Sequence, residues 1–107
     1  MPLIRIEFDD VTVPIEDIQS LSQNVQQIVS EVTGIEDVFV YANSAQIKIK
    51  IAPIEIFIEM SAHKIQDVDI LLKEIKERIV TWKNSQEFTH PINLTLIPMN
   101  WKMEIGI

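Results

Sequence analysis

Met1-Pro2-Leu3-Ile4-Arg5-Ile6-Glu7-Phe8 opens the chain and decides how the rest of it is organised. Leu3 to Phe8 alternate between apolar and mixed residues, the period-two pattern that predicts a β-strand. Pro2 stands at the start of this strand, where its missing N–H costs no ladder hydrogen bond. If an aminopeptidase removes Met1, Pro2 becomes a free secondary amine. A desolvated amine has a lowered pKa and can act as a base near neutral pH. The plainer interpretation is that Pro2 only begins a strand.

The composition excludes several classes of protein. A chain of 107 residues, 47% of them hydrophobic, predicts one globular domain over residues 1–107. A net charge of -7 argues against nucleic acid and anionic membranes, because phosphate groups are bound by clustered Lys and Arg. No apolar run is long enough to span a bilayer. The start of the chain does not resemble a signal peptide, and the lack of cysteine excludes a disulfide framework, so a cytoplasmic location is expected.

Two stretches have the apolar spacing of amphipathic helices. The first runs from Ile15 to Val32, with Pro14 suited to its first turn and Gly34 placed to stop it. The second runs from Ile65 to Trp82. At an offset of 50 residues, the apolar positions of the two helices coincide, which indicates an internal repeat.

Further alternating stretches predict strands at residues 37–41, 46–51, 54–60 and 91–97, and the tail, residues 101–107, alternates in the same way. Asn43 and Ser44 suit a tight turn between the first two of these strands. The sequence therefore predicts two successive β-α-β units, with pseudo-repeats at about 1–51 and 52–107. Crossover connections are right-handed, so we expect an α+β, two-layer fold: a mixed sheet with both helices on one face.

The other face of the predicted sheet combines aromatic and charged residues. If Ile4, Ile6 and Phe8 point toward the helices, Arg5 and Glu7 point away from them, together with Leu3, Phe39, Tyr41, Lys48, Lys50, Glu55, Phe57, Asn93, Thr95 and Ile97. This mixture is too aromatic for open water and too charged for a dry core. It is typical of a wet subunit interface.

The Met-Pro start of a strand, the doubled β-α-β frame and the strand-like tail together resemble the tautomerase superfamily. The chain is similar in length to macrophage migration inhibitory factor and 5-carboxymethyl-2-hydroxymuconate isomerase, and is twice the unit of 4-oxalocrotonate tautomerase. It most resembles bacterial tautomerase-like domains of unknown function. Pro98-Met99-Asn100 and Glu104-Ile105-Gly106-Ile107 are similar to the C-terminal pattern of migration inhibitory factor.

The resemblance implies a homotrimeric, cofactor-independent tautomerase or isomerase that acts on a small carbonyl or enol substrate. It makes Pro2 the catalytic base, puts Ser61 and Ala62 in the loop whose backbone N–H contacts substrate, and matches Asn93 and Thr95 to polar site positions. Phe39 would be contributed by a neighbouring subunit and would form an aromatic side of the substrate site. The family often has an Arg or Lys near the first helix that binds a substrate carboxylate. This chain has no basic residue between Arg5 and Lys48, so Lys48, Lys50 or Arg5 would have to take that role. At the position of Asn93 the family has a tyrosine, whose phenol can act as an acid, whereas the Asn93 amide cannot.

Other arrangements of reactive residues are less specific. His63 and His90 lack a short metal-binding spacing, so no metal site is expected. Ser61, His63 and Asp67 are too close in sequence to imply a catalytic triad, which is recognised by geometry. The alternative function is a non-catalytic oligomeric domain that keeps the fold without the chemistry. A ferredoxin-like regulatory module fits the extra strand and the tail poorly.

Overall fold

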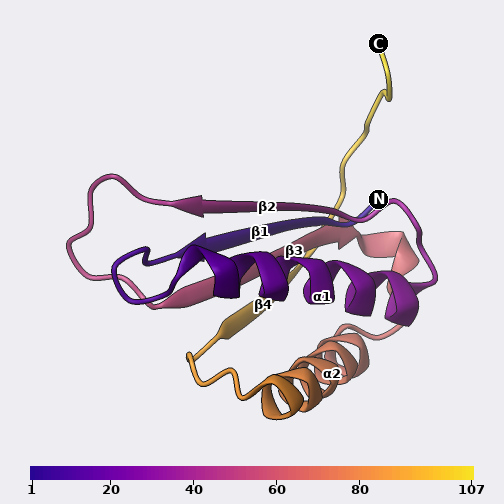
Figure 1. Cartoon of the computed structure of the whole chain (residues 1–107). Coiled ribbons are helices and arrows are strands. Elements are labelled where there is room, and N and C mark those ends of the chain that lie inside the picture. The colour runs from indigo at the N-terminus through magenta and orange to yellow at the C-terminus, as the bar shows by residue number, and fades with distance from the viewer.

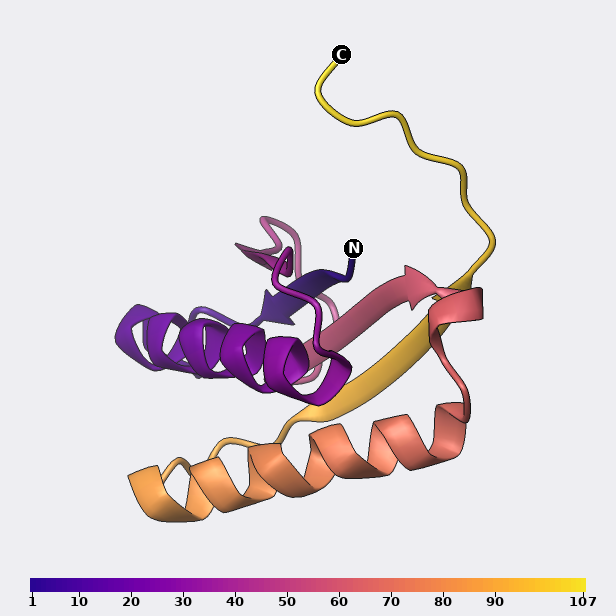
Figure 2. The ribbon, with the colours of Figure 1, turned by 90° about the vertical axis from the view of Figure 1, so that its right-hand side faces the viewer.

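The structure is a computed structural model that describes all residues, 1–107. Its elements, in chain order, are β1 (Leu3–Phe8), α1 (Ile15–Thr33), β2 (Phe39–Ser44), β3 (Ile54–Ser61), the 3-10 turn η1 (Ala62–Lys64), α2 (Val68–Gln86) and β4 (Asn93–Met99). The strands form one four-stranded sheet in the order β2-β1-β3-β4. β1 is parallel to β2 and antiparallel to β3, and β3 is parallel to β4. Both helices cover the same face of this mixed sheet, as predicted (Figure 1 and Figure 2).

The core lies between the sheet and the two helices. Every second residue of the central strands is buried, so that Ile4 and Ile6 of β1 lie beside Ile56 and Ile58 of β3. The helices fill the other side of this layer with apolar residues at helical spacing, namely Ile18, Leu21, Val25, Val29, Ile75 and Ile79. Side-chain alternation along β1 and β3 therefore leaves their odd-numbered residues on the open face of the sheet.

The helix predictions are confirmed, except that α2 starts three residues later than predicted and continues past Trp82 to Gln86. α1 begins at Ile15 and ends at Gly34, but the Ile15 side chain is exposed. α2 begins at Val68 and not at Ile65, because Asp67 caps it by accepting a hydrogen bond from the Ile70 N–H. No helix is long and apolar enough to cross a bilayer.

The strand predicted at residues 46–51 is wrong for the isolated chain. This segment lies in the loop between β2 and β3, and the side chain of Ile49 is 96% exposed. Its alternation is strand-like, but Ser44 at the end of β2 and Ile54 at the start of β3 both lie opposite Phe8, so the residues between them pass around the end of β1 and do not run back along the edge of β2. The turn predicted at Asn43 and Ser44 is also wrong, because both residues continue β2 beside Glu7 and Phe8.

The C-terminal predictions are confirmed only in part. β4 extends past the predicted end through Pro98, whose missing N–H is tolerated on an edge strand. The tail after Met99 forms no strand and projects away from the body of the molecule (Figure 1 and Figure 2).

Candidate functional site

Pro2 lies immediately before β1, which is one of the two inner strands of the sheet. The Pro2 side chain is buried. Its carbonyl oxygen accepts a hydrogen bond of 3.2 Å from the Phe39 N–H at the start of β2. β1 and β2 are parallel and β3 is antiparallel to them, so the starts of β1 and β2 meet the end of β3 at one edge. The candidate site is this corner of the sheet.

The end of β3 supplies the polar groups of the corner. Leu3 lies opposite Glu59, and two residues further on Ser61 is only 7% exposed. The Ser61 Oγ is 2.8 Å from Nδ1 of His63, which lies in the 3-10 turn that Ala62 begins. The N-terminus lies near the end of β3 and this turn in both ribbon views (Figure 1 and Figure 2). Ser61 and Ala62 are thus in the same corner as Pro2.

Phe39 is also in this corner. It lies opposite Leu3 and is 44% exposed. The structure therefore puts Phe39 beside the Pro2 of its own chain, whereas the resemblance had it lent by a neighbouring subunit.

Arg5 is close to the site but is already neutralised. Its guanidinium lies 3.2 Å from the Glu59 carboxylate and 3.7 Å from that of Glu7, and 4.9 Å from the centre of the Phe57 ring. These partners hold Arg5 flat on the open face. A substrate carboxylate would have to compete with two glutamates for it.

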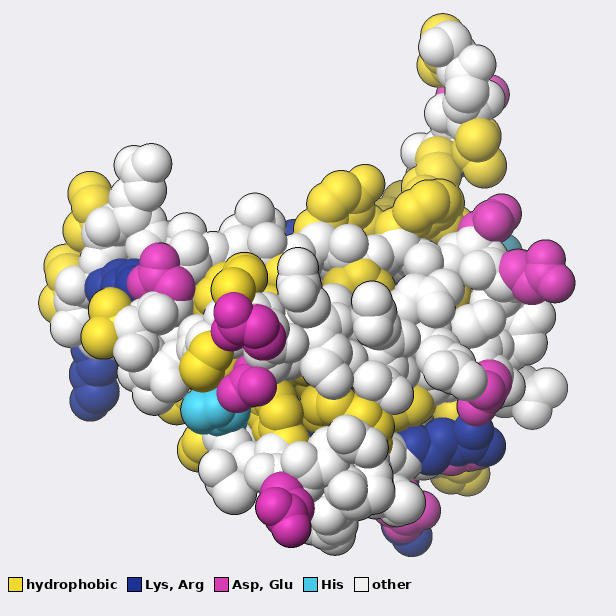
Figure 3. All heavy atoms as spheres, in the orientation of Figure 1, with side chains coloured by type: hydrophobic (Ala, Val, Ile, Leu, Met, Phe, Trp, Pro, Cys, Tyr) yellow, Lys and Arg dark blue, Asp and Glu magenta, His cyan; other side chains and the backbone are white.

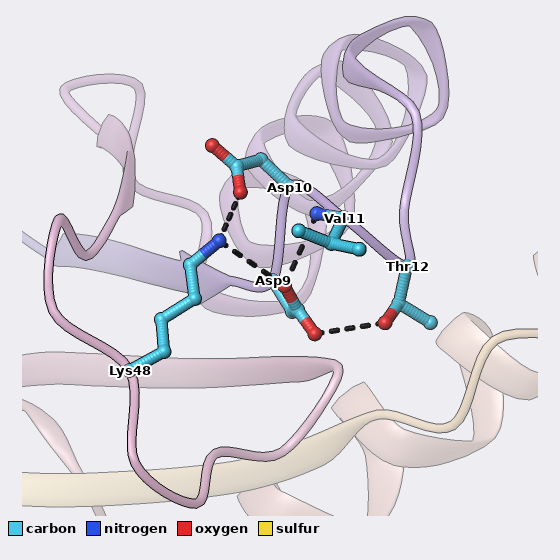
Figure 4. Close-up of polar contacts among 5 residues, drawn as sticks. All are labelled: Asp9, Asp10, Val11, Thr12 and Lys48. Atoms are coloured by element: carbon cyan, nitrogen blue, oxygen red, sulfur yellow. Dashed lines mark hydrogen bonds and ion pairs between the residues drawn. The ribbon is translucent and has the colours of Figure 1, made fainter.

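Lys48 lies at the opposite end of the sheet from Pro2. Its ammonium binds the carboxylates of Asp9 and Asp10, in the loop that follows β1 (Figure 4). The hydrogen bond from Lys48 is the main cause that lowers the pKa of Asp10, while the Thr12 hydroxyl and the Val11 N–H lower the pKa of Asp9 more than Lys48 does. The same Asp10 contact raises the pKa of Lys48. This lysine is therefore committed to a structural ion pair.

Lys50 is at that end too. It lines a surface cavity of about 310 Å³ together with residues of β1, β3 and the loop between β2 and β3, namely Glu7, Phe8, Ala45, Ile51, Ala52, Glu55 and Phe57. Pro2 is not part of this cavity. Within one chain, the structure does not bring Lys48 or Lys50 to the Pro2 corner.

The two β4 candidates are likewise distant from Pro2 in their own chain. Asn93 lies opposite Glu55 and donates a 2.9 Å hydrogen bond to its carboxylate. Thr95 lies opposite Phe57, midway along β3. The β4 residues level with the Pro2 corner are Ile97 and Met99, opposite Glu59 and Ser61.

The Ser61–His63 contact was not predicted from the sequence, in which Ser61, His63 and Asp67 are too close together to imply a triad. A serine two residues before a histidine gives no periodic signal. Their contact arises because β3 ends at Ser61 and the chain turns at once into η1.

Comparisons with known proteins support the fold. No protein-family profile matches the chain, and no curated protein does. Solved structures do: the wild-type asymmetric trimer of fused 4-OT superposes with a TM-score of 0.67 at 16% identity, over 97% of this chain and 92% of that one. A macrophage migration inhibitory factor-like protein from Entamoeba histolytica gives 0.60 at 18% identity, over 96% and 93%.

A domain of unknown function from Sebaldella termitidis gives a TM-score of 0.65 at 11% identity, over 100% of this chain and 98% of that one. The chain therefore has the fold of the tautomerase superfamily. At these identities the likeness defines the fold and leaves the chemistry to be argued from the residues.

Proposed function

We propose that the chain, once Met1 has been removed, is a cofactor-independent keto–enol tautomerase that uses the Pro2 amine as its base. The observation that carries this proposal is the position of Pro2, buried at the start of a central strand in a fold shared with tautomerases. Burial disfavours the protonated amine and so makes it a better base near neutral pH. Backbone N–H groups at Ala62 would stabilise the enolate oxygen.

The assembled form in this proposal is a homotrimer with a small carbonyl or enol substrate. Phe39, Ser61 and Ala62 line the site from the Pro2 chain. Asn93, Thr95, Lys48 and Lys50 can take part only from a neighbouring subunit. The absence of cysteine is the basis for the cytoplasmic location that we include here.

Pro2→Ala tests the chemistry. Processed wild-type protein should ketonise phenylenolpyruvate, the reverse of enolisation, in which the protonated Pro2 amine returns the proton to the α carbon; a positioned acid–base group accounts for about 10²–10⁴-fold of such a rate. We expect Pro2→Ala to lose most of that factor in kcat/KM, measured by the decay of the enol absorbance. Pro91→Ala, which changes an exposed proline before β4, should retain the rate.

The state of the N-terminus is the second arm of this test. Protein that retains Met1 should be as inactive as Pro2→Ala, because an amide nitrogen is not a base; intact mass identifies each form. Equal rates from the processed, Met1-retaining and Pro2→Ala proteins would show that Pro2 is not the catalyst.

The alternative is a non-catalytic oligomeric domain. One observation favours it: Arg5, the cation closest to the corner along β1, is already bound by Glu59 and Glu7. Inactivity of fully processed protein on several enols would support this alternative.

A further inference from the structure

The Ser61–His63 pair is the one hydroxyl–imidazole contact of the Pro2 corner that the proposed chemistry leaves unused. Ser61 is buried, whereas His63 is exposed to solvent. The 2.8 Å contact from Oγ to Nδ1 is short enough for a proton to pass between them. Solvent on the far side of the ring lets His63 exchange that proton with water.

The register of the sheet, extended two residues beyond Leu3, brings this pair next to the Pro2 amine. Leu3 lies opposite Glu59 on antiparallel β3, so continuing the pairing puts Pro2 opposite Met60 and Met1 opposite Ser61. Ser61 is on the open face, as Glu59 is, because side chains alternate along a strand. Removing Met1 therefore vacates the position opposite Ser61 at the same moment that it creates the Pro2 amine.

We propose that Ser61, backed by His63, is the proton-transfer partner of Pro2. This inference rests on the proposed tautomerase function and names the second group of the same site. In ketonisation, the enol O–H gives its proton to Ser61 as the Ser61 hydroxyl proton passes to neutral His63, and the Pro2 ammonium gives a proton to the α carbon. Enolisation runs the same transfers in reverse, and water resets both groups.

In this scheme Ser61 is catalytic, and His63 is a positioning residue that acts through it. The pair supplies the acid–base function that Asn93 cannot provide as a replacement for the family tyrosine.

Besides His63 and the Pro2 amine, charged side chains of β1, β3 and the start of α2 lie around the corner. The Glu59 carboxylate is paired with Arg5, and that of Asp67 caps α2. Two further charged residues are close in sequence to the corner, namely Lys64 in η1 and Asp37, two residues before Phe39. Imidazole is the side chain whose charge ordinarily changes between about pH 5 and 8, so variants at both histidines separate the contribution of His63 from that of the other groups.

The pH profile of processed protein tests the inference. Because neutral His63 must accept the enol proton, kcat/KM for phenylenolpyruvate should fall as the pH drops from about 8 to 5. His63→Gln and Ser61→Ala should each lower kcat/KM at neutral pH by about 10-fold or more, given the usual value of a positioned acid–base group. Each variant should also lose the fall in kcat/KM at acidic pH, the acidic limb of the profile.

His90→Gln is the matched control. His90 is the only other histidine, is bound to Asp17, and should leave both the rate and the limb unchanged. An acidic limb that survives in His63→Gln would overturn the proposal.

A second measurement does not depend on turnover. In an NMR titration of processed protein, the ring resonances of His63 should shift once with the imidazole and again as the Pro2 amine titrates, because interacting groups titrate together. The resonances of His90 should show no second shift. A single shift at His63 would overturn the pairing. Inactive processed protein whose His63 still reports the Pro2 amine would contradict the proposed function and leave the pairing intact.

Discussion

Gly34 and Glu87 show how a single residue ends each helix. Both have left-handed backbone conformations, with φ of 72° at Gly34 and 54° at Glu87. The Gly34 N–H donates to the Ser30 carbonyl, and the Glu87 N–H donates to the Lys83 carbonyl. Glycine adopts this conformation without strain, whereas a side chain costs about 1 kcal/mol there. The two helices therefore close by the same geometry at different conformational costs.

Reciprocal substitutions at these caps should have opposite effects. Gly34→Ala should lower the free energy of unfolding by about 1 kcal/mol, and Glu87→Gly should leave it unchanged or raise it by up to about 1 kcal/mol. Nothing lies within 4 Å of a Cβ built at Gly34, so the loss would come from backbone strain alone. Urea unfolding at one fixed protein concentration measures both changes. A Gly34→Ala protein as stable as wild type would refute the strain argument.

At the scale of an element, the loop between β2 and β3 is attached to the body by Lys48. The ammonium reaches Asp9 and Asp10 in the loop after β1, and the Asp9 N–H donates to the Pro53 carbonyl at 3.0 Å (Figure 4). The pKa of each carboxyl is lowered, so its contribution to stability is present above the unfolded pKa and is lost as the pH falls through the lower folded value. The pKa of Lys48 is raised, so its contribution is complete below about 10.4 and is lost above that.

Lys48→Met should therefore loosen this loop at neutral pH. We expect faster amide hydrogen exchange across residues 45–53 in Lys48→Met than in wild type, and no such change in Lys50→Met, since Lys50 forms no ion pair with Asp9 or Asp10. The difference in thermal stability between Lys48→Met and wild type should shrink below about pH 3.9, the ordinary range for protonating aspartate. Unchanged exchange at neutral pH would mean that the ion pair does not hold the loop.

At the scale of the whole molecule, apolar surface is concentrated on segments without a partner in the chain. Ile47 and Ile49 in the loop, and Ile105 and Ile107 in the tail, are nearly fully exposed. Apolar side chains gather on the loop, along the edge near β2 and on the tail (Figure 3). Both segments have strand-like alternation. These features support the proposed trimer, in which each segment would pair with a neighbouring subunit.

Light scattering should report a mass of three times the 12.3 kDa chain at micromolar concentration. Deleting residues 101–107, or replacing Ile49 with Ser, should shift the protein toward monomer because each change removes apolar surface from the proposed interface. Val80→Ser is the control, since Val80 is an exposed apolar residue on α2, outside these segments. A wild-type monomer would contradict the proposed assembly.

The sequence determined the layers of this fold because they depend on local periodicity. The alternation of Ile4, Ile6 and Phe8 and the helical spacing from Leu21 to Val29 identify which side chains must leave water, and the structure buries them. Gly34 marked the end of α1 for an equally local reason. Pro2 could be singled out because its chemistry as a chain-terminal amine is a property of the residue itself.

Only the tertiary structure decided which polar residues meet. Alternation at residues 46–51 predicts a strand, but this segment connects β2 to β3 around the end of β1 and does not pair with the free edge of β2. The strand order and register put the loop that carries Lys48 and Lys50 at one end of the sheet, and the end of β3 at the other, beside Pro2, where the turn into η1 joins Ser61 to His63. Contacts between residues distant in sequence follow from strand order and register, which apolar patterning constrains only through the face that each residue occupies.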